Sequence, residues 1–391
     1  MTTKFSGSFW VEVVESAEGV EAHVAAWEDL AEHAIDANAF YEPWMLLPAL
    51  RSFGTSGALA FLFVYRADPV RPDGPPLLCG FVPLERRRFK GLPVPVLTLY
   101  KPPYFHLCTP LLRVGHAVDV LHAVFEWART DRRGAALLNF AVVPADGPFN
   151  QALVDAVHEH AAMTCQWETY NRALMRRAPS AGAYLATAMS AGHRKELRRL
   201  RRRLADMGTL ESRELGPGDD LEQWITAFLQ LEVSGWKGQE RSALGSGAAS
   251  RDYFVAVAQG AFARGRLFML GLFLDGKPIA LKCSFISGQG GLAFKIAYDE
   301  SFARYSPGVQ LEIDNIEALH RRPDLQWMDS CARPRHFMIN RLWTERRPIQ
   351  LLLISTGGWI GDVAVGVLPL LRGGRRAFRR PRTAAALEGV R

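Results

Sequence analysis

The 391-residue sequence has few cysteines and none of the groupings through which cysteines bind metal or form bridges. Its five cysteines include no CxxC pair and lie in apolar stretches, so we expect reduced, buried thiols. Met1–Trp10 lacks the basic and then apolar layout of a secretory signal. Before residue 345, no run approaches the roughly 20 apolar residues of a membrane-spanning helix. We therefore expect a cytoplasmic protein body that binds no metal.

Local signatures of nucleophilic catalysis are also missing. No serine–histidine–aspartate or cysteine–histidine arrangement has a supporting motif. His158 and His160 lie two residues apart on an expected helix, where they face different directions and make a poor metal pair. The composition, with 48% apolar and 22% charged residues, is that of a folded globular protein, and it excludes a disordered chain. The length allows two or three domains.

The net charge of +7 comes from two short segments. His193–Arg203 holds six Arg and one Lys against one Glu, and Arg372–Arg391 holds seven Arg against one Glu. The rest of the chain is mildly acidic. This pattern indicates an acidic body with two basic patches, and it differs from the uniformly basic surface of a general nucleic-acid binder.

Strands and helices alternate twice along the chain. Each half is expected to contain antiparallel strands followed by alternating helices and strands, and Asp275–Gly276 is the strongest hairpin signal. We predict an α/β protein with a duplicated domain and mixed, largely antiparallel sheets. The predicted parts are an N-terminal domain (1–177), a C-terminal domain (178–356) whose last strand is Ile349–Ile354, and an apolar helix with an Arg-rich tail (357–391).

The most informative stretch is an expected helix start at Ser306-Pro307-Gly308. Ser306 suits the N-cap, Pro307 the first helical position, and Gly308 a close approach of a ligand to the backbone. The backbone N–H groups of Gly308, Val309 and Gln310 would then be free at the positive end of the helix dipole. Such a helix start suits the binding of a pyrophosphate. The same three-residue start also begins many helices that bind nothing.

Three further groups of residues accompany this helix start. They are Glu232 with Gly235-Trp236-Lys237-Gly238, Phe294-Lys295 with Tyr298-Asp299, and Trp327-Met328-Asp329-Ser330-Cys331-Ala332. Together these residues resemble the double-domain branch of the GNAT N-acyltransferase superfamily, which includes CelD-type cellulose-biosynthesis proteins and is distantly related to FemAB-type aminoacyl transferases. The resemblance covers most of Leu221–Arg347, and the N-terminal half is similar to a degenerate first copy. The helix start departs from the usual GNAT phosphate loop, which is richer in glycine and begins with Gln or Arg.

The resemblance implies two tandem GNAT-like domains and an acyl-CoA co-substrate. The pantetheine arm would lie between the strands Leu292–Tyr298 and Leu325–Ser330, and backbone N–H groups of the first strand would stabilise the oxyanion. The implied cofactor-binding residues are Ser306, Gly308, Val309, Gln310 and Lys295. Lys295 needs a partner between its apolar neighbours, which would be Asp329 or a phosphate, unless it faces solvent.

The acceptor amine must lose a proton, so the resemblance also implies a nearby carboxylate or histidine. Asp329 and His336 are the candidate bases, and Tyr298 is a candidate donor to the departing thiolate. Asp329 alternatively caps a helix over Ala332–Asn340, His336 alternatively lies at the surface or in a cap, and Tyr298 alternatively is an ordinary strand-end aromatic. The residues expected to border the acceptor pocket are Glu232, Trp236 and Lys237, although Trp236 also suits the core.

The Arg-rich segment is expected to be a helix over His193–Met207. Leu197, Leu200 and Leu204 fall on one stripe, which would pack on the core. The basic face is then either solvated or in contact with CoA phosphates, anionic lipid or RNA. FemAB-type relatives that use aminoacyl-tRNA carry a long coiled-coil arm, and this helix is too short for one, so we expect no nucleic-acid partner.

The C-terminal part combines an apolar helix with a basic tail. Trp359–Leu371 is too short to span a membrane but suits its interface, with Arg372–Arg382 on anionic headgroups. We therefore expect a cytoplasmic protein that is peripheral on the inner membrane. In the alternative, this helix covers the first domain and leaves a disordered tail.

These expectations combine into an acyl-CoA-dependent N-acyltransferase that acylates a lipid amine. A sphingoid base converted to a ceramide is the preferred example, which would place the protein in lipid metabolism. One alternative is an acyltransferase acting on a sugar in exopolysaccharide or cellulose biosynthesis. Another is a non-catalytic accessory protein that has kept the fold.

Overall fold

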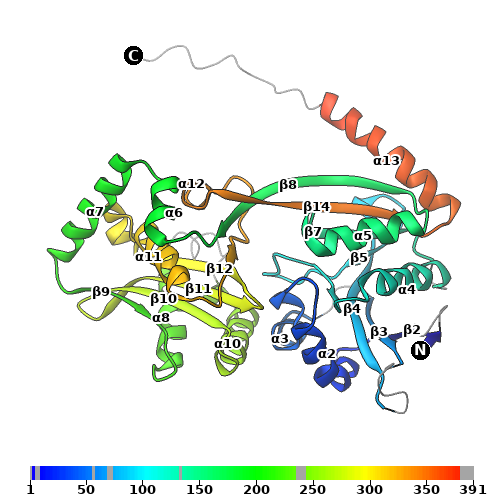
Figure 1. Cartoon of the computed structure of the whole chain (residues 1–391), viewed down its shortest axis with the longest axis horizontal. Coiled ribbons are helices and arrows are strands. Elements are labelled where there is room, and N and C mark those ends of the chain that lie inside the picture. Colours follow the sequence, from blue (N-terminus) through cyan, green and yellow to red (C-terminus); the bar gives the residue numbers. More distant parts are fainter. Residues whose placement is uncertain are drawn as a thin grey trace.

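One sheet of 14 strands runs through the chain in a computed structural model that describes residues 2–4, 9–54, 58–67, 74–131, 134–234 and 244–378 (Figure 1). The strands, in chain order, are β1 (Thr2–Lys4), β2 (Phe9–Val14), β3 (Leu59–Arg66), β4 (Leu77–Arg88), β5 (Pro95–Leu99), β6 (Leu111–Leu112), β7 (Leu137–Pro144), β8 (Thr164–Arg176), β9 (Leu210–Glu214), β10 (Leu267–Leu274), β11 (Lys277–Ser287), β12 (Gly290–Tyr298), β13 (Trp327–Asp329) and β14 (Glu345–Ser355). Their order in the sheet is β1-β2-β3-β4-β5-β7-β14-β8-β13-β12-β11-β10-β9, and β6 pairs with β4.

The helices, in chain order, are α1 (Ala17–Val20), α2 (Val24–Glu32), α3 (Pro43–Phe53), α4 (Ala117–Thr130), α5 (Gly147–Glu159), α6 (Ala181–Ala188), α7 (Ala191–Ala205), α8 (Leu221–Ser234), α10 (Ala248–Ala263), α11 (Pro307–Arg321), α12 (Ile339–Leu342) and α13 (Trp359–Phe378). A 3-10 turn, η5 (Glu300–Tyr305), precedes α11. Serine side chains cap α1, α6 and α7, because Ser16 accepts from the Gly19 N–H, Ser180 from the Ala183 N–H and Ser190 from the His193 N–H.

Each half contains one parallel strand pair among antiparallel neighbours. β5 and β7 are parallel and are joined through α4, while β12 and β13 are parallel and are joined through α11. Every other pairing of the named strands is antiparallel. The predicted fold class, an α/β protein with mixed and largely antiparallel sheets, is confirmed.

Strand pairing connects the two halves where they meet. β14, from the end of the chain, inserts between β7 and β8, and β8 in turn pairs with β13 of the second half. Figure 1 shows β8 and β14 as two long strands lying side by side across the top of the molecule. The predicted last strand of the second domain, Ile349–Ile354, lies within β14 but pairs with β7 and β8, which both belong to the first half.

Two local predictions are wrong. The helix expected over Ala332–Asn340 is a loop that ends in the single turn of α12, because Pro334 disfavours helical backbone at the residue before it. The apolar residues of Gly19–His33 recur at helical spacing and predict one continuous helix, but the segment is broken into α1, a 3-10 turn and α2.

Buried polar contacts join the two halves. The Glu42 carboxylate at the start of α3 is 2% exposed, and it accepts hydrogen bonds from the Ser287 hydroxyl at 2.5 Å and from Arg266 in the second half. α3 also packs on α10, where the Tyr253 hydroxyl contacts Met45. The candidate site therefore lies on a seam whose two sides are held together by buried contacts.

Candidate functional site

The centre of the site is the place where β12 and β13 stop pairing. Their parallel register has three pairs and ends at Leu292 opposite Asp329. β12 continues to Tyr298, and a bulge removes Phe294 from its ladder with β11. The bulge interrupts the regular pairing of β12 beside the point where β12 and β13 separate, and the contact of its backbone N–H groups with an oxyanion stays a prediction.

The start of α11 lies next to the end of β12, where Gly308 neighbours Tyr298, and it differs in detail from the sequence prediction. Ser306 occupies the N-cap position in a left-handed conformation (φ +54°), and its side chain makes no capping hydrogen bond. Pro307 is the first helical residue, as predicted. The Gln310 N–H donates to the Ser306 carbonyl at 3.0 Å, and the Gln310 side chain donates to the Leu197 carbonyl at 2.8 Å.

Two backbone donors are therefore available at this helix start, where three were expected. Within the described ranges, the N–H groups of Gly308 and Val309 donate to no acceptor, whereas that of Gln310 is committed inside the helix. A side chain at Gly308 would put its Cβ 3.4 Å from Cδ1 of Tyr298. The Tyr298 ring thus flanks the two donors, and its role toward a thiolate stays a prediction.

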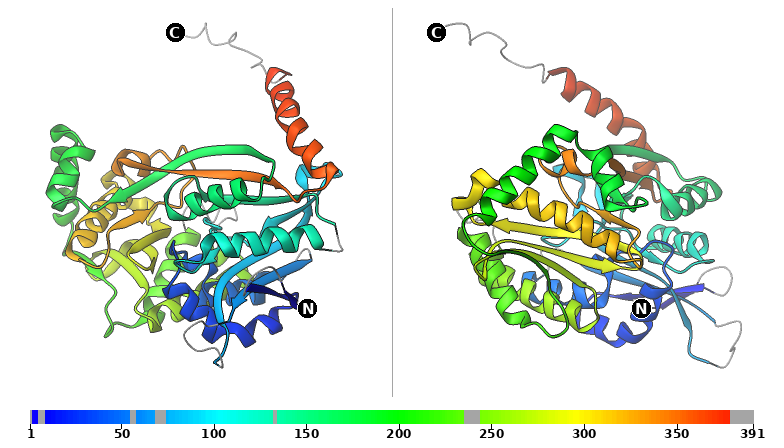
Figure 2. Two further views of the ribbon diagram at one scale, coloured as in Figure 1. Left: turned by 45° about the vertical axis from the view of Figure 1, so that its right-hand side comes forward. Right: turned by 60° about the vertical axis from the view of Figure 1, so that its left-hand side comes forward.

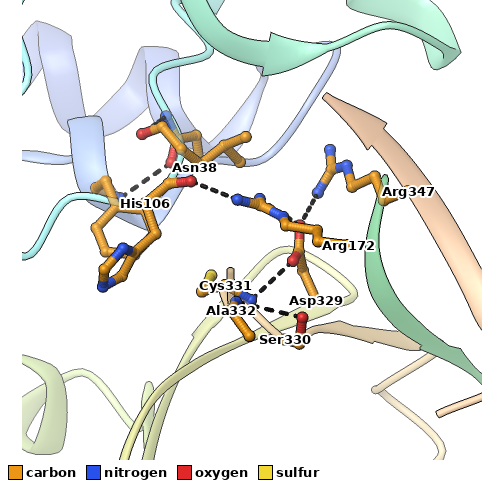
Figure 3. A network of polar contacts seen from close by, with 10 residues as sticks. Asn38, His106, Arg172, Asp329, Ser330, Cys331, Ala332 and Arg347 are labelled. Atoms are coloured by element: carbon orange, nitrogen blue, oxygen red, sulfur yellow. Dashed lines mark hydrogen bonds and ion pairs between the residues drawn. The ribbon is translucent and has the colours of Figure 1, made fainter. Parts of the chain in front are cut away.

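Asp329 is fully buried at the last position of β13, inside a network of charged groups (Figure 3). Its Oδ2 accepts from Arg172 at 2.5 Å and from Arg347 at 3.0 Å, and its Oδ1 accepts from the Cys331 N–H at 2.9 Å. Burial alone would raise the pKa of Asp329, but the two guanidinium groups lower it below the usual range.

The surroundings of Asp329 argue against both expectations for it. Both oxygens of this carboxylate are already engaged by two arginines and a backbone N–H, so neither is open to the proton of an acceptor amine. It also caps no helix, because the next helix begins only at Ile339. Its contacts indicate an anchoring role, in which one negative charge fixes two arginines from β8 and β14.

One of these arginines holds a loop of the first half against the second half. Arg172 donates to the His106 carbonyl at 2.5 Å, and Asn38 donates to the Thr109 carbonyl at 2.8 Å, so the loop is held at two points (Figure 3). The His106 ring extends away from Arg172 and lies 6.5 Å from the ring of Phe294, the bulged residue of β12.

His106 is a site residue that sequence reasoning missed. Burial, followed by the positive charges of Lys101, Arg172 and Lys295, lowers the pKa of its imidazole to about 3, so the ring is neutral near pH 7. A single histidine in an irregular, proline-rich loop carries no periodic signal in the sequence. Only its location after two prolines, Pro102 and Pro103, marks the segment as a loop.

Two predicted site residues pair with each other. The Lys295 ammonium is 2.5 Å from the Glu232 carboxylate, which is 1% exposed and also accepts from the Leu244 N–H. The expected pairing of Lys295 with Asp329 is therefore wrong. The Lys295 ammonium also lies 5.2 Å from the ring centre of Tyr104, which comes from the same loop as His106.

Of the other predicted site residues, one lies in a loop before α12 and two lie outside the described residues. His336 is half-buried in the loop before α12, where its Nδ1 lies 3.4 Å from the Ile339 N–H and its ring stacks on Phe337. Trp236 and Lys237 lie outside the described residues. No group of three His, Cys, Asp or Glu side chains within the described ranges is arranged to hold a metal ion.

Comparisons with known proteins agree with this arrangement. Residues 191–337 match the family described as acetyltransferase (GNAT) domain. No curated protein sequence matches the chain.

Three solved structures share the fold at low sequence identity. A conserved protein of unknown function from Bacteroides thetaiotaomicron VPI-5482 has a TM-score of 0.53 and 10% identity over 85% of this chain and 97% of its own. FemX has a TM-score of 0.53 and 9% identity over 88% and 96%. The C-terminal domain (DUF2156) of a protein named as a lysylphosphatidylglycerol synthetase, from Agrobacterium fabrum, has a TM-score of 0.52 and 13% identity over 90% and 96%.

The family match and the site overlap in the chain. β9 through β13, with α11 and the helix start at Ser306, fall within the matched residues 191–337. These elements carry the diverging strands and the two available backbone donors. Residues 191–337 of this chain are therefore similar to a GNAT acetyltransferase domain, and that family suggests an acyl-CoA-dependent transferase.

Proposed function

We propose that the protein is an acyl-CoA-dependent N-acyltransferase whose acceptor is a lipid amine, such as a sphingoid base that is converted to a ceramide. The observation that supports acyl-CoA as the donor is the start of α11. The N–H groups of Gly308 and Val309 lie at the positive end of a 15-residue helix, beside the end of β12, which extends beyond its pairing with β13. A diphosphate is the group that such a helix start binds.

The proposed reaction needs no covalent enzyme intermediate. A neutral amine attacks the thioester carbonyl, the carbonyl oxygen becomes an oxyanion, and the C–S bond breaks to release the coenzyme thiolate. Backbone N–H groups near the bulge at Phe294 are the proposed donors to the oxyanion. The amine finally transfers its extra proton to a base, which leaves the amide product.

The proposed base is His106, which the first half supplies. No described residue hydrogen-bonds to its ring nitrogens, so a nitrogen lone pair is open to the amine, whereas both oxygens of Asp329 are engaged. Asp329 is a weaker candidate because Arg172 and Arg347 occupy its carboxylate. Under this proposal, Asp329 acts through Arg172 to position the loop that carries His106.

α13 supports a lipid acceptor held at a membrane surface. Trp359 is 76% exposed and Leu370 is 73% exposed, with Val363 between them on the same side of the helix. The opposite side packs on the sheet through Val365 and Leu368. Among the described residues, no helix has the length and apolarity needed to cross a membrane.

The sequence around this apolar face suits an anionic surface. Six arginines stand between Arg372 and Arg382, directly after the exposed apolar positions. An apolar helix face next to a basic segment is typical of helices that lie in the membrane interface. Figure 2 shows α13 projecting from the body of the molecule, which leaves its outer face open to such a surface.

The proposal is tested by thiol release from palmitoyl-CoA in the presence of single acceptors. The panel contains sphinganine, glucosamine and a soluble primary amine, and product masses identify the acylated molecule. We expect thiol release and a ceramide with sphinganine. Acylation of glucosamine alone would support a sugar-directed enzyme, and no thiol release with any acceptor would leave a non-catalytic protein.

A further inference from the structure

We propose that α7 and η5 form a cradle for a phosphate monoester, and that its ligand is the 3′-phosphate of the coenzyme. The proposal rests on the donor function proposed above, and it adds a second anion site to the one at α11. A hollow of about 510 Å³ lies between the two elements. Its lining consists of Glu196, Arg199, Leu200, Arg203, Asp206, Arg304 and Tyr305.

The helical repeat of α7 selects which of its arginines face the hollow. Arg199 and Arg203 are four residues apart, so they project from the same side of the helix. Leu197 and Leu204 face the core on another side and are buried. Arg202 is exposed and does not line the hollow, although it neighbours Arg203 in the sequence.

The arginines around the hollow differ in how far their charge is balanced. Arg199 is paired with Glu196 at 2.5 Å. Arg203 and Arg304 form no ion pair with any residue in the described ranges, and the Arg304 guanidinium lies 4.8 Å from the ring centre of Tyr305. Asp206 is the one carboxylate of the lining that forms no ion pair within the described ranges, so the two unpaired guanidinium groups outnumber it and give the hollow a net positive charge, which suits an anionic phosphate monoester.

The position of the hollow identifies the ligand more closely. Tyr305, on its wall, directly precedes Ser306, the N-cap of α11. The cradle therefore adjoins the free N–H groups of Gly308 and Val309. A ligand that carries a diphosphate and a separate monoester within one nucleotide would reach both anion sites at once, and coenzyme A is such a molecule.

The test compares the binding of CoA and 3′-dephospho-CoA to the full chain by calorimetry. We expect the wild-type protein to bind 3′-dephospho-CoA about tenfold more weakly, as the loss of a charge-assisted hydrogen bond predicts. Arg203→Gln and Arg304→Gln should each weaken CoA binding and bring the two affinities close together. Arg202→Gln, the matched control on the same helix, should leave the ratio unchanged.

Each contrary result has a distinct meaning. Equal affinity of the wild-type protein for both coenzymes would overturn the cradle and leave the proposed donor function standing, as would equal weakening of both by Arg203→Gln. Absence of binding to either coenzyme would overturn the donor function itself. Loss of binding to phosphatidylglycerol vesicles in Arg203→Gln, with an unchanged coenzyme ratio, would assign the arginines to lipid and also overturn the cradle.

Discussion

Asn139 of β7 occupies in the first half the register position that Asp329 of β13 occupies in the second. Each is the last residue of a three-pair parallel register, opposite Thr98 in one case and Leu292 in the other. Asn139 donates to the Thr98 hydroxyl at 3.0 Å, whereas Asp329 binds two arginines. The first half has an amide where the second has the charge, so it lacks the anchor on which the candidate site is built.

Asp329→Asn is expected to destabilise the fold strongly. The substitution leaves Arg172 and Arg347 buried without their carboxylate, which costs about 3–5 kcal/mol of unfolding free energy for a broken buried pair. Urea unfolding measures the change. Asp324→Asn is the matched control, because that carboxylate is 56% exposed and its pair with Arg322 is worth less than about 1 kcal/mol. Similar stability of the two variants would contradict the anchoring role.

Gly308→Glu is expected to weaken acyl-CoA binding by about tenfold or more, because a negative side chain would face the diphosphate at the start of α11. The glycine is the second residue of its helix, next to Tyr298. Gly192→Glu is the matched control, since Gly192 is also the second residue of a helix and has open space around it. Calorimetry with CoA measures both, and equal affinities would remove the diphosphate from α11.

His106→Gln is expected to lower kcat by about 10²–10⁴-fold while the KM for acyl-CoA stays nearly constant, as for the loss of a base that contacts only the acceptor. His336→Gln tests the other candidate histidine in the same assay. His158→Gln, on α5, is the control for a histidine outside the site. A large loss at His336 together with a small loss at His106 would transfer the role of base to His336.

The stability of the protein should fall as the pH decreases below about 6.5, partly because of His106. Its pKa is about 3 in the folded protein and 6.5 in the unfolded chain, so between these values the unfolded state binds the extra proton. Each pH unit in this window costs up to about 1.4 kcal/mol per such group. Thermal unfolding from pH 7 to pH 4 should show a smaller loss for His106→Gln than for the wild type, and identical slopes would contradict the lowered pKa.

Val363→Asp is expected to reduce binding to phosphatidylglycerol vesicles by about tenfold, because burying a valine in an apolar phase contributes at least about 1.5 kcal/mol. Val363 is 55% exposed on the outer face of α13. Val154→Asp, at a valine that is 51% exposed on α5, is the control. Cosedimentation with vesicles measures the difference, and equal binding of the two variants would argue against α13 as the contact.

Much of the fold could be predicted from local patterns. The stretches Phe9–Val14 and Leu210–Glu214 each predict a strand and form β2 and β9, and the strong hairpin signal at Asp275–Gly276 joins β10 to β11. These elements depend on residues close together in the sequence. The insertion of β14 between β7 and β8 depends on pairings between strands about 200 residues apart, for which periodicity carries no information.

The site shows the same division between local and distant information. The helix start at Pro307 and Gly308 could be predicted because capping chemistry is local. The pairing of Lys295 with Glu232 crosses 63 residues, and the contact of Arg172 with the His106 carbonyl crosses 66. A polar residue in an apolar stretch predicts that a partner exists, but the neighbouring sequence does not identify that partner.

The placement of β14 also sets a limit on how this chain can fold during synthesis. Until Glu345–Ser355 has left the ribosome, β7 has an open edge on the side where β14 will pair. The N-terminal half must therefore wait for almost the whole chain before its sheet is complete. Release of a truncated product that ends before residue 345 would leave two exposed strand edges, on β7 and β8, that are ready to associate with other chains.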